Sequence, residues 1–185
     1  MSITNNQINN DTISLLKSLI GLKLEQMFHE EFIVVTVSYG FVFFKIDGKT
    51  YALSDFYEVK DILGDEEEIS TLKFYEYNDK MESQIVNGKI CSQSINSTIN
   101  KITLVNSKTT VTINNDKKEL LDTHAIIFTL DDGYEYSFEK DDFGENISIE
   151  RGYNLSDKFT RLKDELLDSY DSDLNPQIEL YFSSI

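Results

Sequence analysis

Two segments of the chain share one pattern, and this pattern constrains the fold more than any other feature. Residues 40–48 read GFVFFKIDG and residues 124–133 read HAIIFTLDDG. In both, apolar residues recur at every second position and an Asp-Gly turn signal follows, which is typical of a strand that enters a β-hairpin. We therefore expect antiparallel β-structure in which Val42, Phe44 and Ile46 point into the core.

The similarity continues past the two turns and predicts an internal duplication. Tyr51 and Leu53 correspond to Tyr136 and Phe138. The first segment then contains an insertion of about nine residues within positions 57–68, which the second segment lacks. Inserted loops run over the surface and often carry function. We therefore expect an exposed loop here.

The remaining patterns predict the α+β class: antiparallel β-sheets from a duplicated hairpin or meander unit, with two packed helices. Apolar residues at helical spacing indicate helices at 11–20 and 157–170. Runs of β-branched residues indicate strands at 32–37, 102–105, 109–113 and 178–182, and residues 92–100 read as a polar loop.

We expect one domain over residues 1–185, because this length suits a single core. Its approximate halves are 11–80 and 98–170, preceded by a flexible N-terminus at 1–10. The first residues carry no signal-peptide pattern, and the longest apolar run is shorter than a membrane span. The expected location is the cytoplasm, away from membranes. A single cysteine, Cys91, excludes an internal disulfide framework and a thiolate zinc site.

The formal net charge of −16 bears on the class of partner. Nucleic acids are bound by proteins that neutralise phosphates with Lys and Arg, so we expect no direct nucleic-acid binding. The expected partner is a cationic protein. The acidity could also serve solubility alone.

No catalytic residue is predicted, and the chain is not expected to be an enzyme. His29 and His124 could form a general acid–base pair, but surface or strand-end histidines are the simpler interpretation. Residues 171–175 open like a calcium loop, yet Pro176 and Phe182 stand where that loop needs Gly and Glu. We therefore expect no metal site and no cofactor.

Acidic residues gather at three places: in the insertion, at the matching place of the second segment, and on the last helix at 164–173. A solvated face is the ordinary reading of one such run. Their recurrence favours a binding surface, with tyrosines as apolar anchors. The predicted partner-binding residues are Tyr57, Glu58, Asp61, Asp65, Glu66, Glu67, Glu68, Tyr75, Tyr77, Asp141, Asp142 and Glu145.

Three runs carry a resemblance to a known group of proteins: Lys17–Gly21 (KSLIG), Asp131–Glu139 (DDGYEYSFE) and Ile149–Asn154 (IERGYN). They resemble uncharacterised bacterial proteins similar to immunity proteins of contact-dependent growth inhibition and other polymorphic toxin systems. The resemblance implies a cytoplasmic protein that binds and neutralises a toxin, often a basic nuclease. Two sheets from a duplicated unit also resemble the Whirly arrangement, by analogy of fold only.

The leading hypothesis is thus an immunity protein that occludes the active site of a cationic toxin domain, such as a ribonuclease. The alternative is an acidic mimic of nucleic acid that inhibits a DNA-binding protein, of the anti-restriction or anti-CRISPR type. Both use the same electrostatics on different targets.

Overall fold

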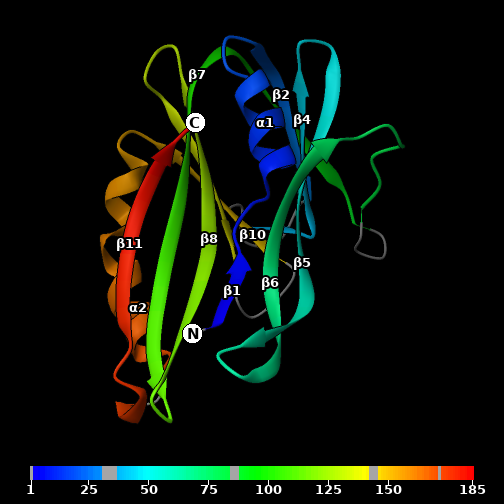
Figure 1. Ribbon diagram of the computed structural model, residues 1–185. Helices are drawn as coiled ribbons and strands as arrows, with labels where there is room; N and C mark the ends of the chain where they lie inside the picture. The colour runs from blue at the N-terminus through cyan, green and yellow to red at the C-terminus, as the bar shows by residue number, and fades with distance from the viewer. Residues whose placement is uncertain (1, 31–36, 84–87, 142–145, 171) are drawn as a thin grey trace.

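The computed structural model describes residues 2–30, 37–83, 88–141, 146–170 and 172–185. Within them the chain is mostly antiparallel β-sheet with two short α-helices, which confirms the predicted α+β class (Figure 1). The helices are α1 (Asn10–Ser18) and α2 (Leu162–Asp168), and α2 lies between the 3-10 segments η1 (Leu155–Arg161) and η2 (Ser172–Leu174). The strands are β1 (Ser2–Asn6), β2 (Lys23–Glu30), β3 (Val37–Tyr39), β4 (Phe41–Ile46), β5 (Lys49–Ile62), β6 (Asp65–Glu76), β7 (Ile90–Ile113), β8 (Asp116–Leu130), β9 (Glu135–Lys140), β10 (Asn146–Gly152) and β11 (Gln177–Ser184).

The long strand β7 belongs to two sheets. Its first part pairs with β2, and that sheet continues through β4 and β5 to β6. Its second part pairs with β8, and that sheet continues through β9 and β10 to β3. Strand β11 pairs with β7, and β1 pairs in parallel with β8 next to the end of β9. In Figure 1 the two sheets face each other, and α2 lies on the outer side of the second sheet.

Aromatic side chains from both sheets meet between them. The ring centroid of Phe44 lies 5.5 Å from that of Phe128 and 5.0 Å from that of Phe138. Val42, Phe44 and Ile46 are 0% exposed, which confirms that these three residues point into the core. Burying such side chains contributes roughly 1.5–3 kcal/mol each, so this layer is a main source of stability.

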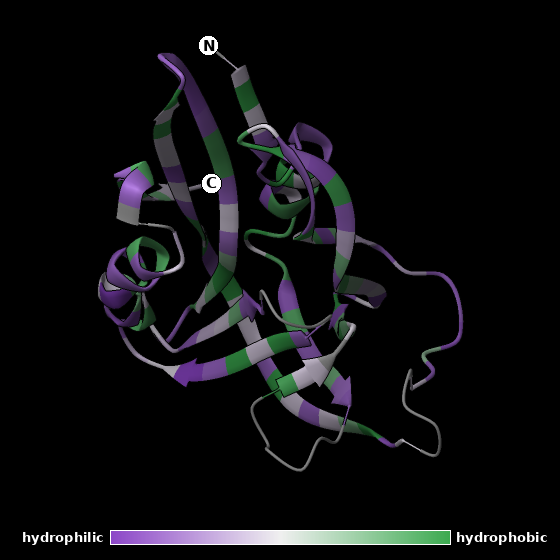
Figure 2. Ribbon diagram, turned by 90° about the horizontal axis from the view of Figure 1, so that it is seen from below, coloured by the Kyte–Doolittle hydropathy of each residue, from purple (hydrophilic) through white to green (hydrophobic). Residues whose placement is uncertain are grey.

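The loop predicted at 92–100 is wrong, because these residues form part of β7. Their peptide groups pair with β2, while Ser92, Ser94 and Asn96 are exposed. A strand needs apolar side chains only on the face that it buries. The same alternation of hydrophilic and hydrophobic residues follows the strands in Figure 2.

Both predicted helices exist with changed bounds. Helix α1 begins one residue earlier than predicted and ends at Ser18, and the Asn9 side chain caps it by accepting a hydrogen bond from Thr12 N at 2.8 Å. The helix predicted at 157–170 is divided into η1 and α2. Phe159 and Leu162, on its predicted apolar stripe, are buried against the second sheet.

The predicted strand at 32–37 lies outside the described residues except for Val37, which opens β3. The N-terminal residues 1–10, expected to be flexible, include β1 and its pairing with β8. Among the described residues no helix combines the length and apolar character that crossing a membrane requires.

Candidate partner-binding surface

The interval predicted as an inserted loop is the distal half of the β5–β6 hairpin. Cross-strand pairs run without a register shift from Tyr51 opposite Glu76 to Ile62 opposite Asp65. Leu63 and Gly64 form the turn with positive φ angles of 59° and 114°. The side chain of Asp61 accepts a hydrogen bond from Gly64 N at 2.6 Å and so stabilises the turn. The insertion is therefore ordered strand rather than loop.

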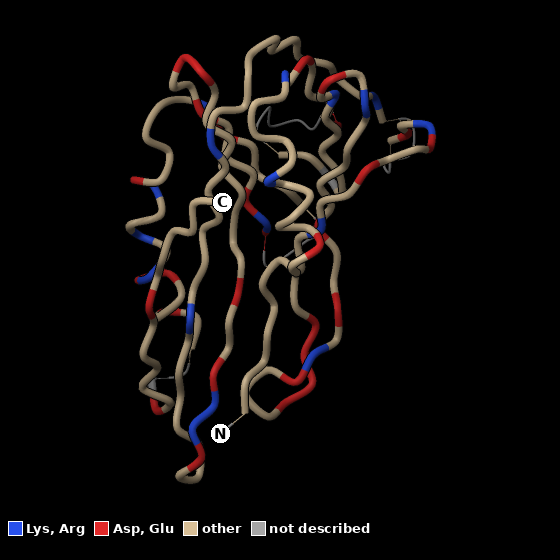
Figure 3. Tube along the Cα trace, turned by 45° about the horizontal axis from the view of Figure 1, so that its top comes forward, with Lys and Arg blue, Asp and Glu red and all other residues tan. Residues whose placement is uncertain are grey.

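Strand alternation sorts the hairpin side chains onto two faces. One face of the distal half carries Tyr57, Val59 and Asp61 from β5 with Glu66 and Glu68 from β6. The three carboxylate-bearing residues are exposed, and Val59 is 65% exposed. Lys and Arg are absent from this set of five residues. We call this set the acidic face; Figure 3 shows the red acidic residues gathered at this end of the hairpin.

Lys60 and Lys73 lie on the opposite face of the hairpin. The Glu58 carboxylate lies 3.0 Å from Lys60 Nζ and 3.0 Å from Lys73 Nζ. The hydrogen bond from Lys73, more than that from Lys60, lowers the pKa of Glu58 below its usual range. Lys60 Nζ also donates to Asn6 Oδ1 at 2.5 Å. These positive charges are thus already engaged, away from the acidic face.

The tip of the hairpin is anchored to the second sheet. Ile62 and Leu63 are buried with Val111 of β7 and Leu120 of β8. Lys118 Nζ also donates a hydrogen bond to the Leu63 carbonyl oxygen. The hairpin is consequently held at both ends, which fixes the orientation of its acidic face.

A buried polar cluster joins the hairpin to the second sheet at mid-length. Lys140 Nζ lies 2.8 Å from both carboxylate oxygens of Asp122 and donates to the Ser70 carbonyl oxygen at 2.8 Å. The Asn6 amide donates to the same Ser70 oxygen and to Asp122 Oδ1, each at 2.8 Å, and Asn6 Oδ1 accepts from Thr71 Oγ1 at 2.7 Å. No pattern in the sequence marks these residues as buried, because lysine and asparagine are mostly exposed in proteins.

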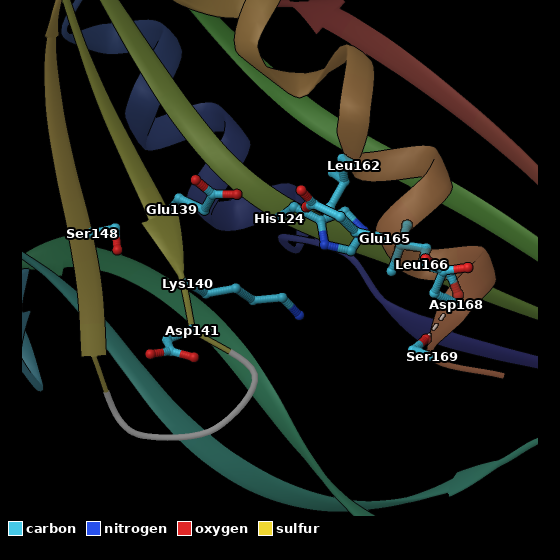
Figure 4. Close-up of a pocket in the computed structure, with 10 residues that line it drawn as sticks. All are labelled: His124, Glu139, Lys140, Asp141, Ser148, Leu162, Glu165, Leu166, Asp168 and Ser169. Carbon is cyan, nitrogen blue, oxygen red and sulfur yellow. Dashed lines mark hydrogen bonds between the residues drawn. The ribbon is translucent and has the colours of Figure 1, made fainter.

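A pocket of about 750 Å³ lies beside this cluster, between α2 and the end of β9 (Figure 4). His124 and Lys140 line it together with Asp141, Glu165 and Asp168. Two acidic clusters that are separate in the sequence thus meet at one pocket. Within the described residues, no group of three or more His, Cys, Asp or Glu side chains has the arrangement needed to hold a metal ion.

Glu139 on the same pocket wall has a perturbed carboxyl group. Burial raises the pKa of Glu139 above its usual range, against the opposing effect of Lys158. Lys158 Nζ lies 3.0 Å from the Glu139 carboxylate and 3.0 Å from that of Glu150. This lysine is therefore shared between two acidic residues.

The contacts of His124 do not have the geometry of a serine–histidine–aspartate triad. His124 is 4% exposed, and its Nε2 lies 2.8 Å from Ser107 Oγ and 3.8 Å from Asp122 Oδ2. A serine–histidine–aspartate triad needs the serine and the carboxylate on different ring nitrogens, whereas here both approach Nε2. Ser107 is itself buried, so a substrate does not reach it. His29 Nδ1 lies 2.9 Å from the Glu30 carbonyl oxygen on β2.

The predicted site residues do not all come together. Tyr75 and Tyr77 belong to the proximal end of the hairpin, where Tyr77 packs on Phe43 with ring centroids 4.9 Å apart. At about 3.3 Å per residue, Tyr75 lies roughly 26 Å along the strand from Glu67. Asp142 and Glu145 fall outside the described residues.

Comparisons of the chain with protein-family models, with curated proteins and with solved structures returned no match.

Proposed function

We propose that this protein is an inhibitor that binds a cationic protein through the β5–β6 hairpin, and that it is an immunity protein for a cationic toxin domain such as a ribonuclease. The observation that carries the proposal is the acidic face, where Asp61, Glu66 and Glu68 surround exposed Val59 and to which neither Lys60 nor Lys73 belongs. An exposed apolar side chain ringed by carboxylates suits the partner's basic and apolar groups together.

The mechanism is occlusion. A nuclease holds substrate phosphates with Lys and Arg side chains, and carboxylates on a rigid hairpin occupy the same positions. Anchoring of the tip by Ile62 and Leu63 reduces the entropy lost on binding, because the hairpin is already ordered. The long-range field of a chain with net charge −16 accelerates encounter with a cationic partner.

The test measures association between this protein and a panel of basic ribonuclease and deoxyribonuclease domains, including any encoded by the neighbouring gene. Rates up to about 10⁸–10⁹ M⁻¹s⁻¹ are expected at low salt. They should fall as the Debye length decreases from about 10 Å at 0.1 M to about 3 Å at 1 M salt. Nuclease activity should be lost in step with complex formation.

A variant with Lys at positions 65–68 reverses the charge of four acidic residues of the hairpin, and a matched variant reverses four exposed acidic residues elsewhere: Asp79, Asp116, Asp164 and Glu179. Both have the same net charge, so a general field effect slows both equally. A specific contact slows the hairpin variant far more and abolishes protection. Equal association for the hairpin variant and the unmodified protein at low salt would remove the hairpin as the site.

We also propose that the two sheets arose by duplication. The meander β2–β4–β5–β6 and the meander β7–β8–β9–β10 have the same order of neighbours, and β7 pairs with β2 between them. Phe44 and Phe128, which correspond in the two sequence segments, contact each other in the core. The Whirly-like arrangement stays a prediction.

A further inference from the structure

Strand β6 lies at the end of its sheet, and within the described residues it pairs with β5 alone. In an antiparallel pair, successive residues direct their peptide groups alternately toward the partner strand and away from it. Three contacts fix the alternation here. Tyr77 N donates to Thr50 O of β5, whereas the carbonyl oxygens of Ser70 and Phe74 accept from groups outside the β5–β6 pair. Even-numbered residues of β6 therefore direct their peptide groups to the outer edge.

Part of this outer edge is already occupied. The Ser70 carbonyl oxygen accepts from Asn6 and Lys140, and the Phe74 carbonyl oxygen accepts from Thr12 Oγ1 at 3.4 Å. Toward the turn, the outward peptide groups are those of Glu66 and Glu68. Both residues are exposed, and β6 has no second strand neighbour there in the described part of the chain.

We infer that an extended basic segment of the partner adds to β6 as a strand, pairing its backbone with the outward peptide groups of Glu66 and Glu68. This inference rests on the proposed function and specifies its mode of contact. Exposed strand edges are templates for strand addition. Glu66 and Glu68 lie on one face of β6, and Asp65 and Glu67 lie on the other. A basic strand paired with this edge would therefore meet carboxylates on both of its faces.

An added strand also alternates its side chains between the two faces. Its lysines or arginines would lie beside carboxylates on either face, at the separation of about 4.5–5.5 Å typical of cross-strand pairs. On the acidic face, Val59 stands opposite Glu68 in the β5–β6 register and offers an apolar contact one strand further in. The occupant is thus a basic β-strand of the partner rather than a helix or a nucleic acid.

The competing explanation is that these acidic residues only prevent edge-to-edge aggregation, as charges on edge strands do. The two explanations differ in whether the backbone of β6 takes part in binding. Proline separates them, since it removes an amide donor and is tolerated on edge strands where that donor faces solvent. It also favours extended backbone at the preceding residue.

The experiment compares Glu66→Pro/Glu68→Pro with Glu66→Gln/Glu68→Gln, which has the same charge and keeps both amides. The probe is a short synthetic peptide of alternating lysine and valine, used alongside the panel domain that binds. The proline variant should bind the peptide roughly tenfold or more weakly than the glutamine variant, because it loses two backbone hydrogen bonds. Equal affinities of the two variants overturn strand addition.

A second measurement does not depend on the folding of the proline variant. Two N-methylated peptides are compared, one methylated at the odd-numbered amides and one at the even-numbered amides, so that each has one edge blocked and the other edge free to pair. One of these two peptides should lose binding to the unmodified protein, and the other should keep it. If both methylated peptides bind as well as the parent, strand addition is wrong, while the proposed function stands so long as lysine at positions 65–68 still abolishes association.

Discussion

The buried cluster between Lys140 and Asp122 gives the sharpest prediction about stability. Lys140→Met removes the ammonium and keeps a flexible side chain of similar length. Asp122→Leu replaces the carboxylate with an uncharged, branched side chain. Each single change leaves a charge in a site where Lys140 is 6% and Asp122 5% exposed.

The magnitude follows from what each variant leaves behind. Breaking a buried ion pair by removing one partner costs about 3–5 kcal/mol, so independent effects would sum to about 6–10 kcal/mol. The double variant contains neither charge. It still deprives the Asn6 amide of its Asp122 acceptor and the Ser70 carbonyl oxygen of its Lys140 donor. At about 1–3 kcal/mol for each group left without that partner, and with Asn6 still bonded to Ser70, we expect a loss of about 2–4 kcal/mol.

Urea denaturation of the unmodified protein, both single variants and the double variant measures the coupling directly. Because total stabilities are about 5–15 kcal/mol, the single variants need a stabilising osmolyte, added equally to all four proteins. The double variant should be more stable than at least one single variant. Additive losses, with a coupling below about 0.5 kcal/mol, would show that the two residues act independently and would refute the reasoning.

Three further predictions concern single residues. Glu58→Gln should lower stability at pH 7 by less than about 1 kcal/mol, since this partly exposed ion pair is screened by solvent. The lowered pKa of Glu58 means that its contribution is present above the usual glutamate pKa and is lost as the pH falls through the lowered value, so the urea midpoints of variant and parent should converge as the pH falls below that value. His29→Ala should leave stability and inhibition nearly unchanged. His124→Ala should lower the free energy of unfolding by about 1–3 kcal/mol in the same urea assay, because Ser107 loses its hydrogen-bond partner at 2.8 Å. Loss of a turnover activity in either folded variant would contradict the proposal that this is a binding protein. Phe44→Ala should cost about 3–5 kcal/mol, and a much smaller loss would show that the core closes around the missing ring.

The parts of the fold that sequence predicts are those set by local periodicity. Val42, Phe44 and Ile46 alternate with outward residues, so their burial follows from the two-residue repeat of a strand. The polar segment at 92–100 was wrongly predicted to be a loop, because it pairs through its backbone while many of its side chains face solvent. The side-chain composition of a segment does not indicate which backbone groups its peptide groups will hydrogen-bond.

The buried cluster could not be predicted for a different reason. Asn6 lies 116 positions from Asp122, and no local pattern marks either residue as buried. The position of the cluster depends on where β9 and β1 each end along β8, which is a property of the assembled sheets. The sequence predicted an exposed acidic segment at 57–68. Because that segment was predicted to be a loop, the distribution of its side chains over two faces of a hairpin was not predicted.

That sorting bears on why the hairpin carries so many carboxylates. Asp61 stands directly opposite Glu66, and like charges in that position destabilise a β-hairpin. The hairpin tolerates them because Ile62 and Leu63 anchor its tip and because Lys60 and Lys73 offset Glu58 on the other face. A sequence selected for stability alone would place one of these lysines opposite Asp61. Lys60 and Lys73 lie on one face, so Asp61, Glu66 and Glu68 on the other face repel one another, and in the proposed complex a basic segment would relieve that repulsion. In the proposed complex, part of the binding free energy would come from relief of this repulsion, which is already present in the unbound protein.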